Sequence, residues 1–128
     1  MTPAERAKEW NKKYYALHRV YNILGGCRRR AEAKGLEYDL TPAWYKEKCN
    51  GVCEITGIPF SLDRPTVKRK KNPLSPSIDR IDIEKGYTMD NCRVVLWAVN
   101  RALGDDGLGF LYYWCKRLVE KVERKKDG

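Results

Sequence analysis

The hydrophobic positions of the chain recur at two different spacings, and each spacing predicts a type of secondary structure. Across Trp10–Leu24, apolar residues return every three or four positions, which indicates one face of an amphipathic helix. The Thr2-Pro3 pair is typical of a helix start, and Gly35 is typical of the residue that follows a helix end. The Gly25-Gly26 pair either breaks this helix or lets it pass close to another element.

The second spacing is that of short β-strands, and it lies in the stretch from residue 76 to residue 104. The runs Ser77–Ile83 and Cys92–Leu96 have strand character and flank turn-forming residues, while Leu96–Leu103 has helical spacing. We therefore predict the order strand, loop, strand, helix. Within the loop, we expect Gly86 to adopt a positive φ angle.

The remaining elements frame this hairpin. Leu36–Leu40 is predicted to be a short strand, and Thr41-Pro42 begins a further helix that runs to about Cys49. A last helix has an apolar face that we expect to pack on the first helix. That face consists of Leu108, Leu111, Trp114 or Cys115, Leu118 and Val122.

The predicted fold class is therefore α+β, with a hairpin-plus-helix core between N-terminal and C-terminal amphipathic helices. The chain has 128 residues, which suits one compact domain with a modest core. We divide it into a basic helical arm (1–35), the hairpin domain (36–104) and a C-terminal helix packing on the same domain (105–128).

The charge balance indicates a polyanionic partner. There are 26 basic and 17 acidic residues, a formal net charge of +9 and an isoelectric point near 9.4. Because the basic residues cluster, nucleic acid is the expected partner. The KRKK run lies in a loop that is either a solvated charge run or a phosphate-gripping segment. The predicted nucleic-acid contacts are Arg28, Arg29, Arg30, Lys68, Arg69, Lys70, Lys71, Arg80, Arg93 and Arg101.

Other features point to a soluble protein of the cytoplasm. No apolar run is long enough to span a bilayer, and the amino terminus is charged where a signal peptide would be apolar. The five cysteines are an odd number, so a disulfide framework is not expected.

Two residues of the hairpin stretch could form a metal site. Asp79 lies on the first predicted strand and Asn100 on the helix, so folding the hairpin against the helix would bring a carboxylate and an amide oxygen together. Such hard oxygen ligands suit Mg²⁺ or Mn²⁺. With its pattern DRID, KGY, DN and N, the segment Leu36–Leu103 resembles the HNH, or ββα-metal (His-Me finger), nucleases, especially small phage-type and endonuclease VII-like domains.

This resemblance implies roles for individual residues. Asp79 and Asn100 correspond to the metal ligands, and Asn91 to the asparagine that braces the loop. Arg80 stands where the family usually has its general-base histidine. Since arginine stays protonated, it could hold a phosphate but could not accept a proton from water. Together with Asp82, these residues form the predicted catalytic set, in which the base is unassigned.

Two further residues are candidates for the general base. Asp82 lies where some relatives have their histidine, and His18, the single histidine of the chain, is remote from the motif in sequence. We expect His18 to be structural or exposed to solvent, with a catalytic role as the alternative.

Relatives of the endonuclease VII type also hold a structural zinc ion. The corresponding positions here are Cys53, Thr56, Leu96 and Val99, so three of the four ligands are missing. We expect apolar packing in place of the zinc. A site made by Cys49, Cys53 and Cys92 is the alternative.

The predicted function is thus a Mg²⁺- or Mn²⁺-dependent HNH-type DNA endonuclease that hydrolyses phosphodiester bonds. One alternative is a weakly active or inactive DNA-binding module on the same scaffold. A more distant one is RNA binding or protein interaction through the surface rich in tyrosine and tryptophan.

Overall fold

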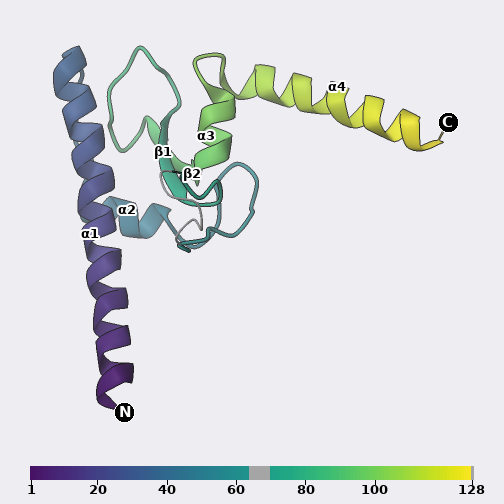
Figure 1. Ribbon diagram of the computed structural model, residues 1–128. Coiled ribbons are helices and arrows are strands. Elements are labelled where there is room, and N and C mark those ends of the chain that lie inside the picture. The colour runs from purple at the N-terminus through teal and green to yellow at the C-terminus, as the bar shows by residue number, and fades with distance from the viewer. Residues whose placement is uncertain (64–69, 128) are drawn as a thin grey trace.

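The computed structural model contains four helices and one antiparallel hairpin in its described part (Figure 1). It describes the backbone of residues 1–63 and 70–127, and the side chains of these residues apart from 7, 9–17, 126 and 127. The elements are α1 (Pro3–Lys34), α2 (Pro42–Lys48), β1 (Pro76–Arg80), β2 (Cys92–Leu96), α3 (Trp97–Leu103) and α4 (Gly107–Asp127). The predicted α+β class is confirmed.

Helix α1 runs without a break through Gly25 and Gly26. The Thr2 hydroxyl accepts a hydrogen bond from the Glu5 backbone N–H, and Gly35 ends the helix in the left-handed conformation. Its buried positions, Leu24, Cys27 and Ala31, lie in the second half, whereas Tyr21 of the predicted apolar face is exposed. The predicted positions Trp10, Tyr14 and Leu17 fall among the side chains outside the described ones.

The hairpin pairs β1 with β2 so that Pro76 lies opposite Leu96 and Arg80 lies opposite Cys92. Strand β1 ends at Arg80 rather than at the predicted Ile83, because beyond Ile81 the chain turns into the loop that leads to β2. The predicted strand Leu36–Leu40 is reduced to a single bridge between Tyr38 and Tyr87.

Gly86 lies in this loop for a reason other than the predicted one. Its φ angle is not among the positive ones. A Cβ atom on Gly86 would instead meet the Glu37 carbonyl oxygen at 2.2 Å. The backbone N–H of Tyr87 donates to that same carbonyl at 2.9 Å, so the loop and the segment after α1 are in direct contact. Glycine is therefore required at position 86 because the Glu37 backbone lies so close, and not because the residue has a positive φ angle.

The core joins the second half of α1 to the hairpin. Leu24, Cys27 and Ala31 of α1 pack in one cluster with residues of α2, of both strands and of the loop. The cluster also contains Leu40, Trp44, Tyr45, Ile78, Tyr87, Cys92 and Val94. The core thus crosses the division predicted between residues 35 and 36, and it fixes α1 beside the hairpin.

Helix α4 does not pack on α1, and that prediction is wrong. Among the helices and strands that the structure describes, α4 contacts α3 alone. Gly104 and Gly107, both at positive φ angles, turn the chain between the two helices, and α4 then extends away from the core (Figure 1). Within the described residues, no helix combines the length and the apolar character needed to cross a membrane.

Candidate functional site

Asp79 and Asn100 line one cleft, which lies between the hairpin, α3 and the second half of α1. The cleft has a volume of about 410 Å³. The cleft is also lined by three basic side chains, those of Arg30, Lys71 and Arg80. We call it the hairpin cleft.

Asp79 is held by the register of the two strands. It lies opposite Arg93, whose Nε donates to Asp79 Oδ2 at 2.7 Å. The residue is 7% exposed, and burial raises the pKa of its carboxyl group above the usual value, although the charges of Arg93 and Arg80 oppose that rise. No described residue donates a hydrogen bond to the other oxygen, Oδ1.

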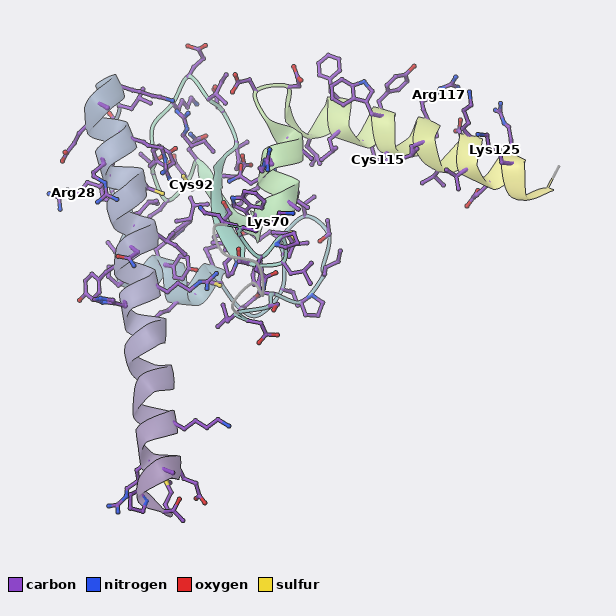
Figure 2. All side chains as sticks on the ribbon, viewed as in Figure 1. Arg28, Lys70, Cys92, Cys115, Arg117 and Lys125 are labelled. Carbon is purple, nitrogen blue, oxygen red and sulfur yellow. The ribbon has the colours of Figure 1, made fainter. Side chains whose placement is uncertain are left out.

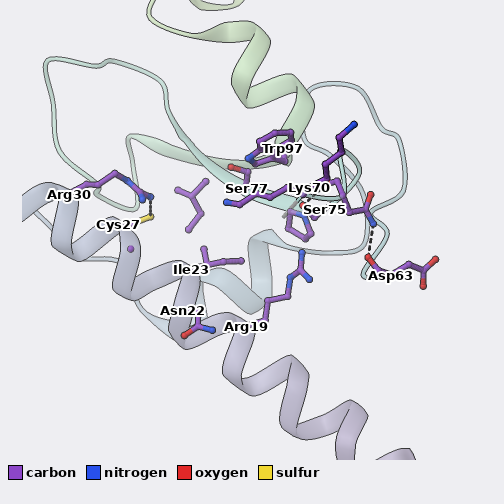
Figure 3. A pocket seen from close by; sticks show the side chains of 15 residues that line it. Arg19, Asn22, Ile23, Cys27, Arg30, Asp63, Lys70, Ser75, Ser77 and Trp97 are labelled. Atoms are coloured by element: carbon purple, nitrogen blue, oxygen red, sulfur yellow. Dashed lines mark hydrogen bonds between the residues drawn. The ribbon is translucent and has the colours of Figure 1, made fainter. Parts of the chain in front are cut away.

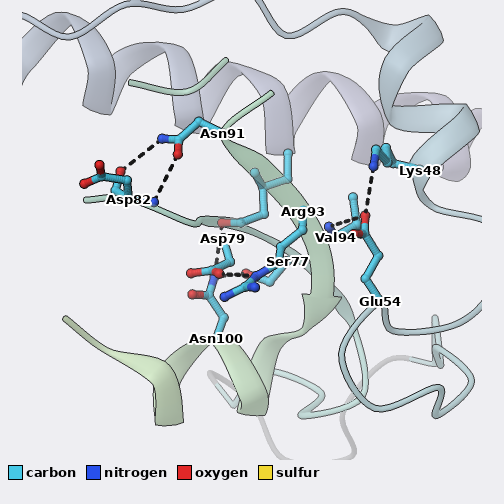
Figure 4. Close-up of polar contacts among 10 residues, drawn as sticks. Lys48, Glu54, Ser77, Asp79, Asp82, Asn91, Arg93, Val94 and Asn100 are labelled. Atoms are coloured by element: carbon cyan, nitrogen blue, oxygen red, sulfur yellow. Dashed lines mark hydrogen bonds and ion pairs between the residues drawn. The ribbon is translucent and has the colours of Figure 1, made fainter. Parts of the chain in front are cut away.

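Asn100 is oriented by β1. Its Nδ2 donates to the Ser77 hydroxyl at 2.7 Å and to the Ile78 carbonyl oxygen at 3.1 Å. Because a carbonyl oxygen can only accept, these contacts identify the nitrogen and leave Oδ1 on the other side of the amide. Figure 4 shows Asp79 and Asn100 side by side beneath the hairpin, with Ser77 and Arg93 next to them.

Helix α3 is attached to the chain just before β1. The backbone N–H of Trp97 donates to the Ser75 carbonyl oxygen at 2.8 Å, and that of Ala98 donates to the Pro73 carbonyl oxygen at 3.1 Å. These bonds use N–H groups of the first helical turn, which have no partner inside the helix. They hold α3, and with it Asn100, against β1.

The oxygen atoms of Asp79 and Asn100 have the chemistry of a partial site for a hard divalent cation. Mg²⁺ is commonly held by one or two protein oxygen ligands, with water and substrate phosphate completing its shell. Among the described residues, no group of three or more His, Cys, Asp or Glu side chains is placed to hold a metal ion. The pair fits a cation that is shared with a phosphate, but does not form a complete protein cage.

Arg80 is bound to the loop that follows it. Its Nη1 donates to the carbonyl oxygens of Ile83 and Lys85, at 2.9 and 3.1 Å. Its guanidinium group also lies over the Tyr87 ring, 4.9 Å from the centroid. Arg80 therefore supports the loop while its side chain lines the hairpin cleft.

Asn91 holds the same loop through hydrogen bonds to the loop backbone. Its buried amide accepts from the Asp82 N–H at 3.0 Å and donates to the carbonyl oxygens of Asp82 and Gly86, at 3.0 and 2.8 Å. This is the loop-bracing geometry that the resemblance implies for Asn91. The carboxylate of Asp82 accepts from the Glu84 N–H at 3.0 Å and lines an adjoining hollow with Asp79, Arg80 and Arg93.

The predicted nucleic-acid contacts divide into several groups. Arg30 enters the hairpin cleft, where its Nε donates to the Tyr87 hydroxyl at 3.0 Å. Lys71 and Arg101 lie over the Trp97 ring, 5.9 and 4.9 Å from its centroid. Lys68 and Arg69 lie outside the described residues.

Two arginines of the basic run on α1 lie differently from Arg30. Arg28 projects from the other side of α1 and pairs with Glu32 at 3.4 Å (Figure 2). Arg29 is exposed and does not line the hairpin cleft. Arg93 is engaged with Asp79.

A basic groove continues from the hairpin cleft along α1. It shares Arg30, Lys71 and Trp97 with the cleft and adds Arg19, Lys70 and Asp63 (Figure 3). The positive side chains thus extend from the Asp79–Asn100 pair toward the middle of α1. His18, which is exposed, lines neither the cleft nor this groove.

Two lining residues were not among the predicted site residues. Ser77 holds Asn100, and Asp105 lines both the hairpin cleft and the hollow beside Asp82. The turn at Gly104, which no periodicity reveals, brings Asp105 to the wall of the cleft that Asn100 also lines.

The cysteines occupy mainly apolar surroundings. Cys27, Cys53 and Cys92 are buried, Cys49 is half-buried and Cys115 is exposed; all five are free thiols. Cys27 and Cys92 belong to the core cluster that contains Val94, whereas Cys53 packs with Val95 and Leu96 in a second one.

Comparison with known proteins supports the fold. No protein-family model matches the chain, and no curated protein matches its sequence. A solved structure of the rare-cutting HNH restriction endonuclease PacI is similar, with a TM-score of 0.52 and 23% sequence identity. The similarity covers 77% of this chain and 80% of that one. Together with the hairpin, the helix that follows it and the brace at Asn91, this similarity shows that the chain has the HNH fold.

Proposed function

We propose that this protein is a metal-dependent DNA endonuclease of the HNH type. The observation that carries the proposal is the presence of Asp79 and Asn100 on the wall of one cleft with three basic side chains. The HNH endonuclease with the similar fold acts on DNA. The formal net charge of +9 agrees with such a substrate.

Asp79 and Asn100 would hold the divalent cation through their oxygen atoms. When bound, a Mg²⁺ or Mn²⁺ ion neutralises charge on the scissile phosphate and stabilises the leaving oxygen. Arg93 keeps the Asp79 carboxylate in place through its bond to Oδ2. Ser77 and the Ile78 carbonyl keep the Asn100 amide in the orientation that presents oxygen rather than nitrogen.

The basic side chains of the cleft would bind the phosphates. Arg30 and Lys71 line the cleft from two separate segments, one on α1 and the other before β1. Arg80, at the position of the usual histidine, remains a cation and contributes charge stabilisation rather than proton transfer. Its bonds to the loop carbonyls hold its side chain on the wall of the cleft that Asp79 also lines.

For the general base we propose Asp105. A carboxylate can accept a proton from water, which arginine cannot do. Asp105 lines the cleft together with Asn100. Asp82 lines the adjoining hollow instead, and one of its carboxylate oxygens accepts a hydrogen bond from the Glu84 N–H. We expect Asp105→Asn to lower the cleavage rate by roughly 10² to 10⁴ and Asp82→Asn by about tenfold or less.

Cleavage of supercoiled plasmid in Mg²⁺, Mn²⁺ or EDTA tests the proposal. Asp79→Asn and Asn100→Ala should abolish metal-dependent cutting and retain DNA binding. These variants also exclude a contaminating nuclease, because a contaminant would be unaffected by the substitution.

The second candidate is a DNA-binding module that does not cut. The observation that favours it is that Arg80, at the position of the usual histidine base, is bound through Nη1 to two loop carbonyl oxygens and lies over the Tyr87 ring. This candidate predicts salt-sensitive DNA binding without cutting in any metal.

A further inference from the structure

Helix α4 has an apolar stripe that no other described element covers. Leu118 is 64% exposed, and Val119 and Val122 are exposed as well. Helix α4 contacts α3 near its start, and the rest of it projects from the core (Figures 1 and 2). Solvent exposure of such a continuous apolar face in a soluble chain indicates a surface that associates with something.

The spacing of the stripe is that of a coiled coil. Leu108, Cys115 and Val122 follow one another at intervals of seven residues. Leu111 and Leu118 are also seven residues apart, and each lies three residues after a member of the first set. These are the alternating three- and four-residue steps of the two core positions in a heptad. This spacing matches a second helix of the same kind.

The charges along α4 are unequal at its two ends. Asp105 and Asp106 immediately precede the helix, and Arg124 and Lys125 lie near its end. Side by side in the same direction, two copies would place their basic ends together. In opposite directions, the acidic start of one copy faces the basic end of the other, which is the more favourable arrangement.

We propose that α4 pairs with α4 of a second copy of this chain, antiparallel, to form a symmetric dimer. Leu111 then lies opposite Val122 of the partner subunit, and Cys115 lies opposite Leu118 of the partner subunit. Each pair occurs twice because the interface is the same patch on both chains. The proposal rests on α4 and on the two aspartates that precede it, and it does not require that the hairpin cleft cuts DNA.

Sedimentation equilibrium of the full chain tests the assembly. We expect a mass of twice 14.9 kDa at micromolar concentration. Leu118→Glu places a charge in the middle of the stripe and should give a monomer. Tyr113→Glu introduces the same residue on the opposite side of α4, at a position that is also exposed, and should remain dimeric.

Circular dichroism spectra that match the unsubstituted protein should accompany both variants. A folded monomer for the unsubstituted chain would overturn the proposal and point to another occupant, such as a different protein or a membrane surface. A dimer that survives Leu118→Glu would overturn it too, because another surface would then hold the two copies.

Oxidative cross-linking tests the direction of pairing. In the antiparallel arrangement, Leu118→Cys places its thiol opposite Cys115 of the partner subunit, so mild oxidation should yield a covalent dimer. Adding Cys115→Ser to that variant should remove most of the cross-link. If the unsubstituted chain instead cross-links efficiently through Cys115 alone, the helices run parallel and the proposed arrangement is wrong.

Discussion

Individual residues of the site depend on neighbours that are distant in sequence. Asn100 presents an oxygen only because Ser77 and the Ile78 carbonyl engage its nitrogen. Asp79 is held by Arg93 on the other strand. The motif indicates which residues form the site. Because their partners are 14 to 23 residues away, the orientation of each group follows from the folding of the hairpin and not from the motif itself.

Gly86 provides a test of close packing at the scale of one residue. Gly86→Ala should destabilise the protein by about 1–3 kcal/mol, because its methyl group would overlap the Glu37 carbonyl. Urea unfolding followed by circular dichroism measures the difference. Gly109→Ala is the matched control: it meets nothing within 4 Å on α4 and should leave stability equal or slightly raised. Equal effects of the two substitutions would contradict the packing explanation.

The thiols provide a second test at this scale. Burial raises the pKa of Cys27 and raises that of Cys92 to about 12. At pH 8 the thiolate of Cys92, the form that reacts, is then about one part in 10⁴. Iodoacetamide followed by peptide mass spectrometry should therefore modify exposed Cys115 rapidly and Cys27 and Cys92 only after unfolding.

At pH 9 Cys92 of the folded protein should still stay unmodified, because its pKa of about 12 leaves the thiolate at only about one part in 10³. Rapid labelling of Cys27 or Cys92 in the folded protein at pH 8 would show that the core is more open than the structure describes.

The elements of the chain carry the clearest lesson about prediction from sequence. The hairpin and α3 follow from strand and helix spacing close together in the chain, and they are found within a few residues of their predicted ends. The continuity of α1 through two glycines does not follow, because it depends on packing of Leu24, Cys27 and Ala31 against the hairpin. The spacing of apolar residues predicts that α4 is an amphipathic helix, but amphipathicity does not specify which surface covers its apolar face.

The position of α1 makes two of its arginines a matched pair. Arg30 enters the hairpin cleft, whereas Arg28 projects from the other side of the helix. Arg30→Ala should weaken DNA binding roughly tenfold. The slope of the logarithm of the binding constant against the logarithm of the salt concentration should become less steep by about one. Arg28→Ala should have a much smaller effect. Fluorescence anisotropy at several salt concentrations measures both quantities.

Because Arg30 also bonds to Tyr87, thermal unfolding of the Arg30 variant separates lost binding from lost stability. If Arg28→Ala weakens binding as much as Arg30→Ala does, the DNA does not run through the cleft.

The whole molecule combines an HNH-fold core with two long helices that differ in the side chains they expose. Helix α1 adds basic groups beside the core, and α4 extends an apolar surface away from it. Net charge and composition alone indicate a nucleic-acid partner, but the arrangement of the basic groups around Asp79 and Asn100 depends on the fold. We therefore propose that this cleft hydrolyses DNA with a bound divalent cation.

The most direct test is cleavage of supercoiled plasmid by the purified protein, with Asp79→Asn and Asn100→Ala variants prepared in the same way. We expect cutting in Mg²⁺ or Mn²⁺, none in EDTA, and none by either variant, while both variants still bind DNA. Cutting by either variant, or in EDTA, would contradict the assignment of the cleft. Binding without cutting by the unsubstituted protein on supercoiled, linear and branched DNA would contradict the endonuclease activity itself.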